Sequence, residues 1–459
     1  MLVFSFYKII TYMFVPIDYF FIAIYLILVV AIGYVASKRE TEESFLIADR
    51  KLGILSGIAT INATKTGGIL LAYTALLYFY GISAFWVFIG IGLGYFAFIP
   101  FAKKLRKISE GRFYTLGDYF RKKFSPLSAK LASSINIIMM VGFFVASLVG
   151  SAKVINLYTG INYTVATILT SSVVLIYLLL AGFKAVVKTD VLQYGVIVFI
   201  LALFAGTLMM GGGFEVGDMN IVSAGAKTII GFLLMGFLLP FASPDLWQRV
   251  YAMKDTDTMS KSIFYSIIIY VVVGAILTLV GLAIKSALPG LDPDTAIIEG
   301  FTQLLPVGFG GLAVIVFFGA FMSSMDTYAF TAASSFVQDY LSRDYSKRKV
   351  VKLTRIFIAV MVVICTIVAL LLASVIVTTY LFVAFAAALA VPVIATWVRP
   401  SIKRLTIEIT LVVGLVFLLL ISTLDILGAG IEPTLIVKGM AGSLLGLCIG
   451  SVTSIVRRS

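Results

Sequence analysis

Residues 52–80 of the chain read LGILSGIATINATKTGGILLAYTALLYFY, and this stretch decides the fold class. It is apolar for longer than the roughly 20 residues that an α-helix needs to cross the hydrocarbon core of a bilayer. Its middle differs, because hydroxyls, a charge and paired glycines follow one another in Ala63-Thr64-Lys65-Thr66-Gly67-Gly68. We therefore expect a membrane-spanning helix that breaks at residues 63–68 and frees backbone groups there.

Apolar runs of this length recur along the whole chain. Of its 459 residues, 61% are hydrophobic and only 12% are charged, whereas a soluble domain is nearer to half apolar and a quarter charged. The pattern predicts an all-α polytopic membrane protein with thirteen spans, at residues 16–37, 52–80, 82–102, 127–157, 163–182, 190–211, 228–252, 262–286, 308–338, 351–374, 377–398, 405–424 and 434–455.

The spans form one transmembrane domain over residues 1–459, because no linker is long or polar enough to separate soluble domains. Within it, residues 16–51 hold the first helix and an inner loop. Residues 52–398 form a core, and residues 399–459 hold two C-terminal helices.

The basic residues orient this domain in the bilayer. If the N-terminus lies outside, most of the 35 lysines and arginines fall in inner segments, including Arg457 and Arg458 near the last residue. Inner loops of membrane proteins are enriched in these residues. The sequence therefore predicts a multi-pass protein of the cell membrane with an outer N-terminus and a cytoplasmic C-terminus.

The absence of certain residues excludes several functions. The chain has no histidine, which removes imidazole acid–base catalysis and histidine-based zinc sites. Its two cysteines, Cys365 and Cys448, lie in separate apolar runs and suggest no disulfide framework. We expect no catalytic residues and no enzymatic activity. The net charge of +13 flanks the apolar runs, which indicates membrane topology rather than nucleic-acid binding.

A second break is expected in the seventh span, where Leu239-Pro240-Phe241-Ala242-Ser243-Pro244 contains two prolines that cannot donate helix hydrogen bonds. Either site taken alone could be a simple kink. After the first span is set aside, however, the two breaks fall in the first and sixth helices. These are equivalent positions in a five-plus-five inverted repeat, which points to the binding site of a secondary transporter.

A transported solute would sit between these breaks. We expect the side chains around both breaks to line its site, together with an aromatic residue of the third span: Lys65, Gly67, Gly68, Trp86, Phe237 and Phe241.

The ninth span carries a polar face in mid-helix. Ser323, Asp326 and Thr327 share one side of the helix by their spacing, and Ser324 adjoins them. Neutral hydroxyl and carbonyl oxygens suit a hard monovalent cation. Alternatively, the serines bond to their own helix or hold helices together. Asp326 is an acid at membrane depth, for which a functional or pairing role is expected.

Four further charges need an explanation. Lys65 would cost about 2.5–3.5 kcal/mol at a helix centre, so we expect an acid partner or an aqueous cavity beside it. Asp190 opens the sixth span, where the helix dipole alone favours an acid. Asp245 and Arg249 stand four residues apart and are interpreted as a structural pair.

Several short motifs follow one another between residues 16 and 400. They are SFLIADRKLG at 44–53, GFKAV at 182–186, TDVLQ at 189–193, WQR at 247–249, and Ser323-Ser324 followed by Asp339-Tyr340. In this order they resemble the motifs of the sodium:solute symporter family, which contains proline, pantothenate, sialic acid and glucose symporters.

The resemblance implies a leucine-transporter-like five-plus-five inverted repeat, with one extra helix before it and two after it. It also implies sodium as the coupling ion, held in a main site by oxygens of the first and eighth core helices. By their match to the family pattern, the residues of this site would be Ala63, Thr66, Ala320, Ser323 and Ser324. A second sodium site of part of the family would use Ser323, Asp190, Asp326 and Thr327.

One position departs from the family pattern. Lys65 stands where relatives usually carry a neutral or acidic residue, directly beside the implied sodium site. Its ammonium could replace sodium, carry a coupling proton, pair with Asp326 or contact an anionic substrate. Leu239 occupies the place of the family's sugar-gating tyrosine, which disfavours a sugar as the solute.

These observations favour a secondary active symporter that imports a small polar organic solute with sodium by alternating access. One alternative is a proton-coupled or sodium-independent transporter of the same fold, with Lys65 in place of the ion. A more remote alternative is a channel or a sensor derived from a transporter. The expected partners are the solute, sodium and the lipid bilayer, while the oligomeric state is left open.

Overall fold

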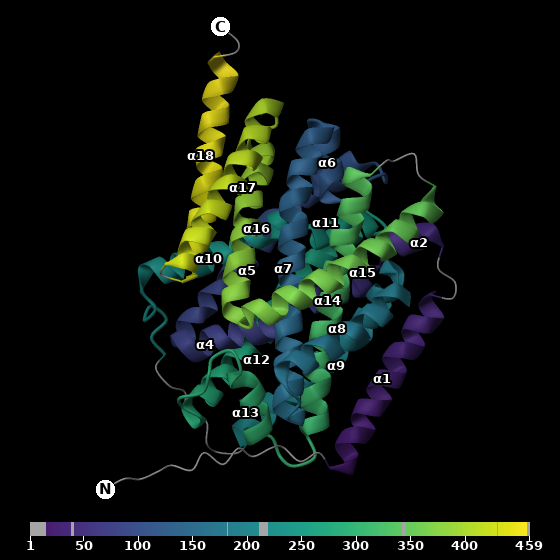
Figure 1. Cartoon of the computed structure of the whole chain (residues 1–459), viewed down its shortest axis with the longest axis vertical. Helices are drawn as coiled ribbons and strands as arrows, with labels where there is room; N and C mark the ends of the chain where they lie inside the picture. The colour runs from purple at the N-terminus through teal and green to yellow at the C-terminus, as the bar shows by residue number, and fades with distance from the viewer. Residues whose placement is uncertain are drawn as a thin grey trace.

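A computed structural model describes residues 15–37, 41–180, 182–210, 219–341, 346–428 and 430–456. Apart from one bridge between Leu52 and Met253, the regular structure in these ranges is helical (Figure 1). The helices are α1 (Pro16–Ser37), α2 (Glu42–Ile47), η1 (Ala48–Arg50), α3 (Ile54–Gly68), η2 (Ile69–Tyr73), α4 (Thr74–Tyr80), η3 (Gly81–Phe85), α5 (Trp86–Ser109), α6 (Leu116–Lys123), α7 (Pro126–Thr159), α8 (Tyr163–Leu180), α9 (Phe183–Met210), α10 (Gly225–Ala242), α11 (Pro244–Ala252), α12 (Thr256–Ala287), α13 (Ala296–Leu304), α14 (Gly310–Tyr340), α15 (Lys347–Leu372), α16 (Val375–Val398), α17 (Arg404–Leu427) and α18 (Thr434–Val456).

Twelve helical segments of the described chain are long and apolar enough to cross a membrane. One of them, Ile54–Ser109, has 56 residues, far more than the roughly 20 that one crossing takes. The chain turns within it at Gly81, whose φ of +62° suits glycine. Both α4 and α5 then pack against α12. Counted as two crossings, this segment gives the thirteen spans that the sequence predicts.

The first predicted break is wrong in its position and its kind. The α-helix α3 continues through residues 63–68, and Gly68 keeps helical dihedral angles (φ −66°, ψ −40°). The hydroxyls of Thr64 and Thr66 bond to carbonyls four residues back in the same helix. The irregularity comes later, as the π-helix η2. Glycine permits an unwound backbone but does not require one, which explains the difference.

The second predicted break is confirmed. Helix α10 ends at Ala242, Ser243 is extended (φ −90°, ψ 96°), and α11 begins at Pro244. Proline is well placed at the first position of a helix, where its missing N–H leaves no helix bond unmade. The two prolines therefore stop one helix and start the next.

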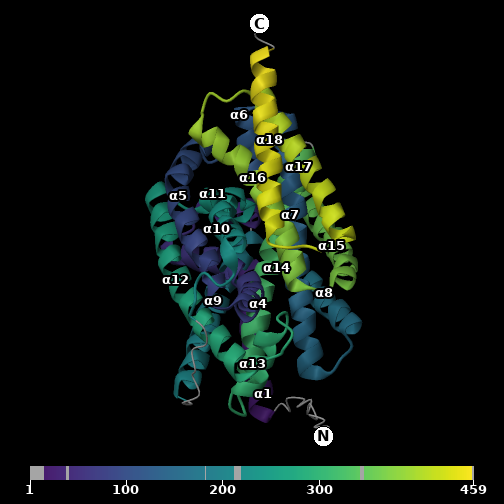
Figure 2. The same ribbon diagram turned by 90° about the vertical axis from the view of Figure 1, so that its left-hand side faces the viewer.

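The two irregular spans lie at the centre of the bundle. The most buried spans around them are α7, α14 and α16, each with 78% of its most apolar window buried, against 22% for α1. Helix α3 packs against α14, α9 and α12, while α10 packs against α5 and α16. Helices α17 and α18 pack against each other, with α18 also beside α16 (Figure 2). Arg457 and Arg458, expected at the cytoplasmic end, lie outside the described residues.

Candidate functional site

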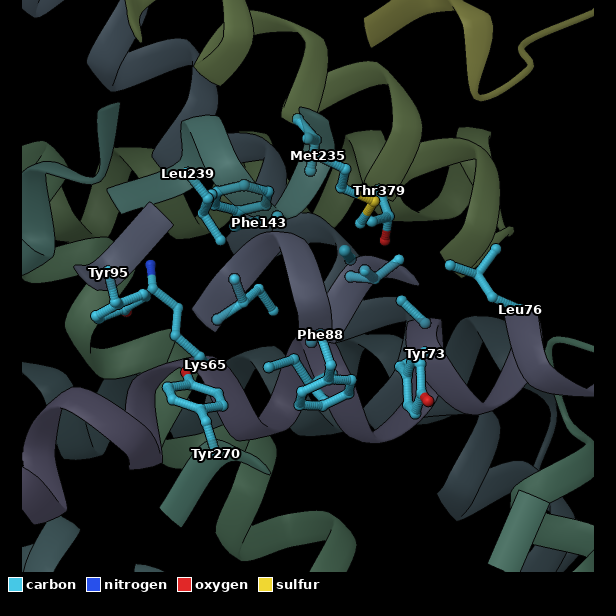
Figure 3. Close-up of a pocket in the computed structure, with 18 of the residues that line it drawn as sticks. Lys65, Tyr73, Leu76, Phe88, Tyr95, Phe143, Met235, Leu239, Tyr270 and Thr379 are labelled. Carbon is cyan, nitrogen blue, oxygen red and sulfur yellow. The ribbon is translucent and has the colours of Figure 1, made fainter. Parts of the chain in front are cut away.

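A cavity of about 80 Å³ lies where the two irregular spans meet the surrounding helices (Figure 3). This is room for more than a single water, which needs about 10–15 Å³ on the same measure. The cavity wall is mostly aliphatic and aromatic, and its polar side chains come from six different helices: Lys65, Tyr73, Tyr95, Tyr270, Tyr328 and Thr379.

Lys65 is the one charged side chain of this wall among the residues described, and its partner differs from the one that the sequence suggested. Its ammonium lies 2.9 Å from a carboxylate oxygen of Asp245 and donates to the hydroxyl of Ser243 at 3.2 Å. Asp245 stands in the first turn of α11, directly after the break, where it can face α3. The proposed pair with Asp326 is therefore wrong, because the break in the seventh span supplies a nearer acid.

Arg249 is the second buried cation, and its side chain is fully enclosed. Its guanidinium donates to the hydroxyls of Thr60, Thr64 and Thr327 and lies 3.7 Å from the carboxylate of Asp190. It reaches Asp245 only at the backbone carbonyl, at 3.0 Å. The predicted structural pair between Asp245 and Arg249 is thus wrong at the level of side chains, since each charge pairs with another residue.

The residues implied for the main sodium site lie on α3 and α14, which pack against each other. The Ser324 hydroxyl donates to the backbone carbonyls of Thr64 and Ala320, both at 2.9 Å. Ser323 turns instead toward Asp190, to which its hydroxyl donates at 2.5 Å. Ala63 and Thr66 are both buried on α3.

Gly67 explains how the two helices approach so closely. A methyl group at this glycine would lie 2.4 Å from the Ser324 hydroxyl oxygen and 2.5 Å from the Ala320 carbonyl oxygen. Both distances are shorter than real contacts allow, so only glycine permits this approach. The packing thereby brings neutral oxygens of α3 and α14 together.

The residues suggested for a second ion site are only partly brought together. Asp190 and Thr327 gather around the Arg249 guanidinium, and Asp190 also accepts from Thr60 at 2.6 Å. Asp326 is fully buried, but neither of its carboxylate oxygens has a hydrogen-bond partner in the part of the chain that the structure describes. A buried carboxylate in this position calls for a cation or a proton.

The charges of this buried polar region do not cancel. Lys65 and Arg249 contribute two positive charges, while three aspartates contribute negative ones: Asp190, Asp245 and Asp326. With all five side chains ionised, the region carries one net negative charge. A single monovalent cation or a proton would balance it.

Only two of the residues expected around the solute line the cavity, namely Lys65 and Gly68. Gly67 faces α14 instead, and Trp86 is turned to donate to the Ile221 carbonyl at 2.8 Å. Phe237 and Phe241 do not line this cavity either: Phe241 packs into a cluster of other aromatic rings, and the backbone of Phe237 lies against Gly94. Leu239 does line the cavity.

Sequence reasoning missed Arg249 as a central residue and missed the tyrosines of the wall. A signal for the tyrosines existed, because tyrosine in membrane proteins favours the two interfaces. Tyr95 and Tyr270 instead lie well inside the long helices α5 and α12. A tyrosine in the middle of a span is therefore unusual. Neither of these two stands out in the sequence, because both lie within long apolar runs.

Comparison with known proteins identifies the relatives of this arrangement. The chain is 26% identical over 379 residues to the osmoregulated proline transporter OpuE of Bacillus subtilis (strain 168), a match that covers 76% of this chain and 77% of that transporter. It is 24% identical over 347 residues to a sodium/proline symporter of Staphylococcus aureus (strain JH9), covering 70% and 68% of the two chains.

Two solved structures show the same fold at low identity. A Na⁺-coupled sialic acid symporter in a substrate-bound outward-open state superposes with a TM-score of 0.77 at 18% identity, covering 96% of this chain and 98% of the other. A nucleobase-cation-symport-1 family transporter in a closed conformation gives 0.61 at 14% identity, covering 89% and 95%. They confirm the predicted leucine-transporter-like architecture.

The family assignment follows from the match of a sequence model. The sequence model of the sodium:solute symporter family matches residues 45–402, which include both irregular spans and the whole cavity wall. The chain therefore belongs to the sodium:solute symporter family, and it is a multi-pass, sodium-coupled transporter rather than an enzyme.

Proposed function

We propose that the protein imports a small polar organic solute through the central cavity, with sodium bound at the contact between α3 and α14. The observation that carries this proposal is the position of the cavity. Both irregular spans contribute to its wall, through Lys65 and Gly68 of α3 and Leu239 of α10. A solute held there touches both halves of the repeat, as alternating access requires.

The main ion site is proposed at the carbonyls of Ala63, Thr66 and Ala320 and the hydroxyls of Ser323 and Ser324. The support is chemical, since the Ser324 hydroxyl and the Thr64 and Ala320 carbonyls already lie within hydrogen-bond distance. Several neutral oxygens with little charge suit a monovalent cation that must bind and leave again.

A second cation is proposed at Asp326, with Asp190 and Thr327 nearby. Its support is the unpaired state of the Asp326 carboxylate and the net negative charge of the region. Arg249 already occupies the neighbourhood of Asp190 and Thr327, so the ion would sit on the Asp326 side of that guanidinium.

The solute is proposed to be small and compact. The relatives in bacilli and staphylococci are named as proline transporters, and a cavity of about 80 Å³ agrees with a solute of that scale. The protein would act in the cell membrane. The N-terminus would lie outside, because basic residues concentrate in the segments between spans that this orientation places inside.

The test is uptake into proteoliposomes. Radiolabelled L-proline is the first of a panel of small organic solutes, each tested with an inward sodium gradient in one arm and choline in the other. We expect at least one of them to accumulate, and to do so only with sodium. Proline uptake that is equally fast in choline would contradict sodium-driven import and restore the alternative in which Lys65 replaces the ion.

The ion site is tested by changing Ser323 and Ser324 together to alanine. We expect the sodium concentration for half-maximal uptake to rise at least tenfold, because two of the proposed oxygen ligands are lost. Ser334→Ala is the matched control, since this buried serine of the same helix has a hydroxyl without a partner in the described structure. An unchanged sodium dependence in the double variant would remove this site from the proposal.

A further inference from the structure

Three polar groups meet at one end of the central cavity. Lys65, Tyr95 and Tyr270 lie at the same end in Figure 3, and Leu76 and Thr379 lie at the other. All three side chains are buried, with residue exposures of 5%, 1% and 4%. The rings of the two tyrosines have centroids 5.8 Å apart. This end of the cavity is the only part of its described wall that carries a charge.

The Lys65 ammonium is held at the edge of the cavity by the break between α10 and α11. The Ser243 hydroxyl accepts from it at 3.2 Å, and the two carboxylate oxygens of Asp245 lie at 3.0 and 2.9 Å. Neither Ser243 nor Asp245 lines the cavity, whereas Lys65 does. A ligand in the cavity therefore meets the cation of this pair, and its acceptor can share the N–H donors of the ammonium with Asp245.

The hydroxyls of Tyr95 and Tyr270 are buried next to each other, and neither has a hydrogen-bond partner outside this pair in the described structure. The other two tyrosines of the wall have theirs. Tyr73 bonds to the Thr278 hydroxyl at 2.6 Å, and Tyr328 donates to the Thr64 carbonyl at 3.0 Å. One of the two hydroxyls can donate to the other, which leaves the second O–H without an acceptor. Leaving a buried polar group unpaired is costly, so this tyrosine pair marks the place where a ligand supplies the missing acceptor.

The rest of the cavity offers no second polar anchor. The Thr379 hydroxyl already donates to the Val375 carbonyl at 2.7 Å. No carboxylate stands among the described residues of the wall, which is otherwise made of residues such as Ile69, Phe88, Ile91 and Phe143. A ligand with an ammonium group would find no acceptor of opposite charge here, and its cation would lie near Lys65.

We propose that the transported solute is a small monocarboxylate with a compact apolar body and no ammonium group. Its carboxylate accepts from the Lys65 ammonium and from the hydroxyls of Tyr95 and Tyr270. The body of the solute packs against the apolar wall. This inference rests on the proposed function, because it names the solute of the same cavity.

The charge of Lys65 limits the solute to one carboxylate. A second carboxylate would have to lie against Ile69, Phe88 or Phe143, where no donor compensates its desolvation. A neutral amide of the same shape would lose the charge-assisted bond to Lys65 and present N–H groups to hydroxyl donors. Acid and amide are therefore the sharpest pair of probes.

The experiment measures binding to the purified full chain in sodium chloride, by the shift of its thermal denaturation. The probes are the unbranched monocarboxylates from acetate to hexanoate, pyruvate and L-lactate, each beside its primary amide, with L-proline as the zwitterion. We expect at least one acid to bind a hundredfold more tightly than its amide and more tightly than proline. Binding of proline or of an amide in preference to every acid overturns the proposal.

Variants locate the site with the tightest-binding acid. Tyr95→Phe and Tyr270→Phe each remove one hydroxyl of the pair and keep the ring, so each should weaken its binding at least tenfold without changing the sodium dependence. Tyr251→Phe is the matched control, because it removes an unpaired buried hydroxyl away from the cavity. Equal affinity in all three variants overturns the proposed carboxylate site.

Lys65 is tested in a background that avoids an unpaired acid. The double change Lys65→Met with Asp245→Asn should abolish binding of the acid. Retained binding in a folded double variant contradicts the role of the ammonium. Sodium-driven uptake of proline without binding of any acid refutes this inference and leaves the proposed function intact. Absence of sodium-driven uptake for every probe refutes the proposed function itself.

Discussion

Asp245 and Asp326 are both buried carboxylates of the same polar region, but only one of them has a partner. Asp245 is bonded to Lys65 at 2.9 Å, and that ammonium also contacts Ser243. Asp326 has no hydrogen bond to either oxygen in the described structure. Burial alone therefore does not tell a structural acid from a functional one. The hydrogen-bond partners of the acid make this distinction. Changing Asp245 to asparagine should lower the stability of the protein, whereas the same change at Asp326 should not.

The largest effect is expected for Asp245→Asn. This change leaves the Lys65 ammonium buried without a counter-charge, which typically costs 3–5 kcal/mol. Thermal denaturation in detergent, with fluorescence or static light scattering as readout, would show the loss. Adding Lys65→Met to the variant should restore most of the stability. If the single variant is as stable as the original chain, the ion pair between Lys65 and Asp245 does not stabilise the fold.

A smaller effect is expected for Ser243→Ala. The variant loses one hydrogen bond to a charged group, worth about 1.5–3 kcal/mol, while the ion pair with Asp245 remains. The same denaturation measurement should place it between the original chain and Asp245→Asn. Because Ser243 is also the extended residue between α10 and α11, Ser243→Thr is the control that keeps the hydroxyl. Loss of stability in both variants would point to the backbone instead.

The smallest effect on stability is expected for Asp326→Asn. No partner is left behind, and the desolvation of an ionised acid is relieved, so stability in choline chloride should stay the same or rise. What should disappear is part of the stabilisation that sodium adds, since a ligand stabilises the state that binds it. Melting curves in sodium and choline salts give both quantities. A strong loss of stability in choline would reveal a partner for Asp326 and erase the contrast with Asp245.

The sequence was sufficient for the architecture and for one of the two irregular spans. Long apolar runs predict helices in a bilayer because no other backbone arrangement satisfies its hydrogen bonds there. Pro240 and Pro244 cannot take part in regular helix bonding, so the interruption at Ser243 follows directly. Gly67 and Gly68 impose no such constraint, and the packing of α3 against α14 kept that helix regular.

The pairing of charges could not be predicted in the same way. The acid that contacts Lys65 is determined by the tertiary structure. It depends on where α10 ends and α11 begins, because this sets the position of Asp245. Sequence spacing placed Asp245 beside Arg249, as neighbours on one helix face, but it carried no information on α3. The hydroxyl pair of Tyr95 and Tyr270 depends on a three-dimensional wall for the same reason.

The unbalanced charge of the buried polar region has an electrical consequence. The buried polar region carries one net negative charge when its two basic and three acidic side chains are all ionised. This charge moves through the membrane field whenever the transporter changes between its outward-facing and inward-facing states. A potential of 100 mV acts on a full elementary charge with about 2.3 kcal/mol. In a cell with a negative interior, the voltage would drive the ion-free carrier toward its outward-facing state, and one bound sodium ion would cancel this force. Transient currents on a solid-supported membrane, recorded without solute, would show this charge movement, and Asp326→Asn should remove it.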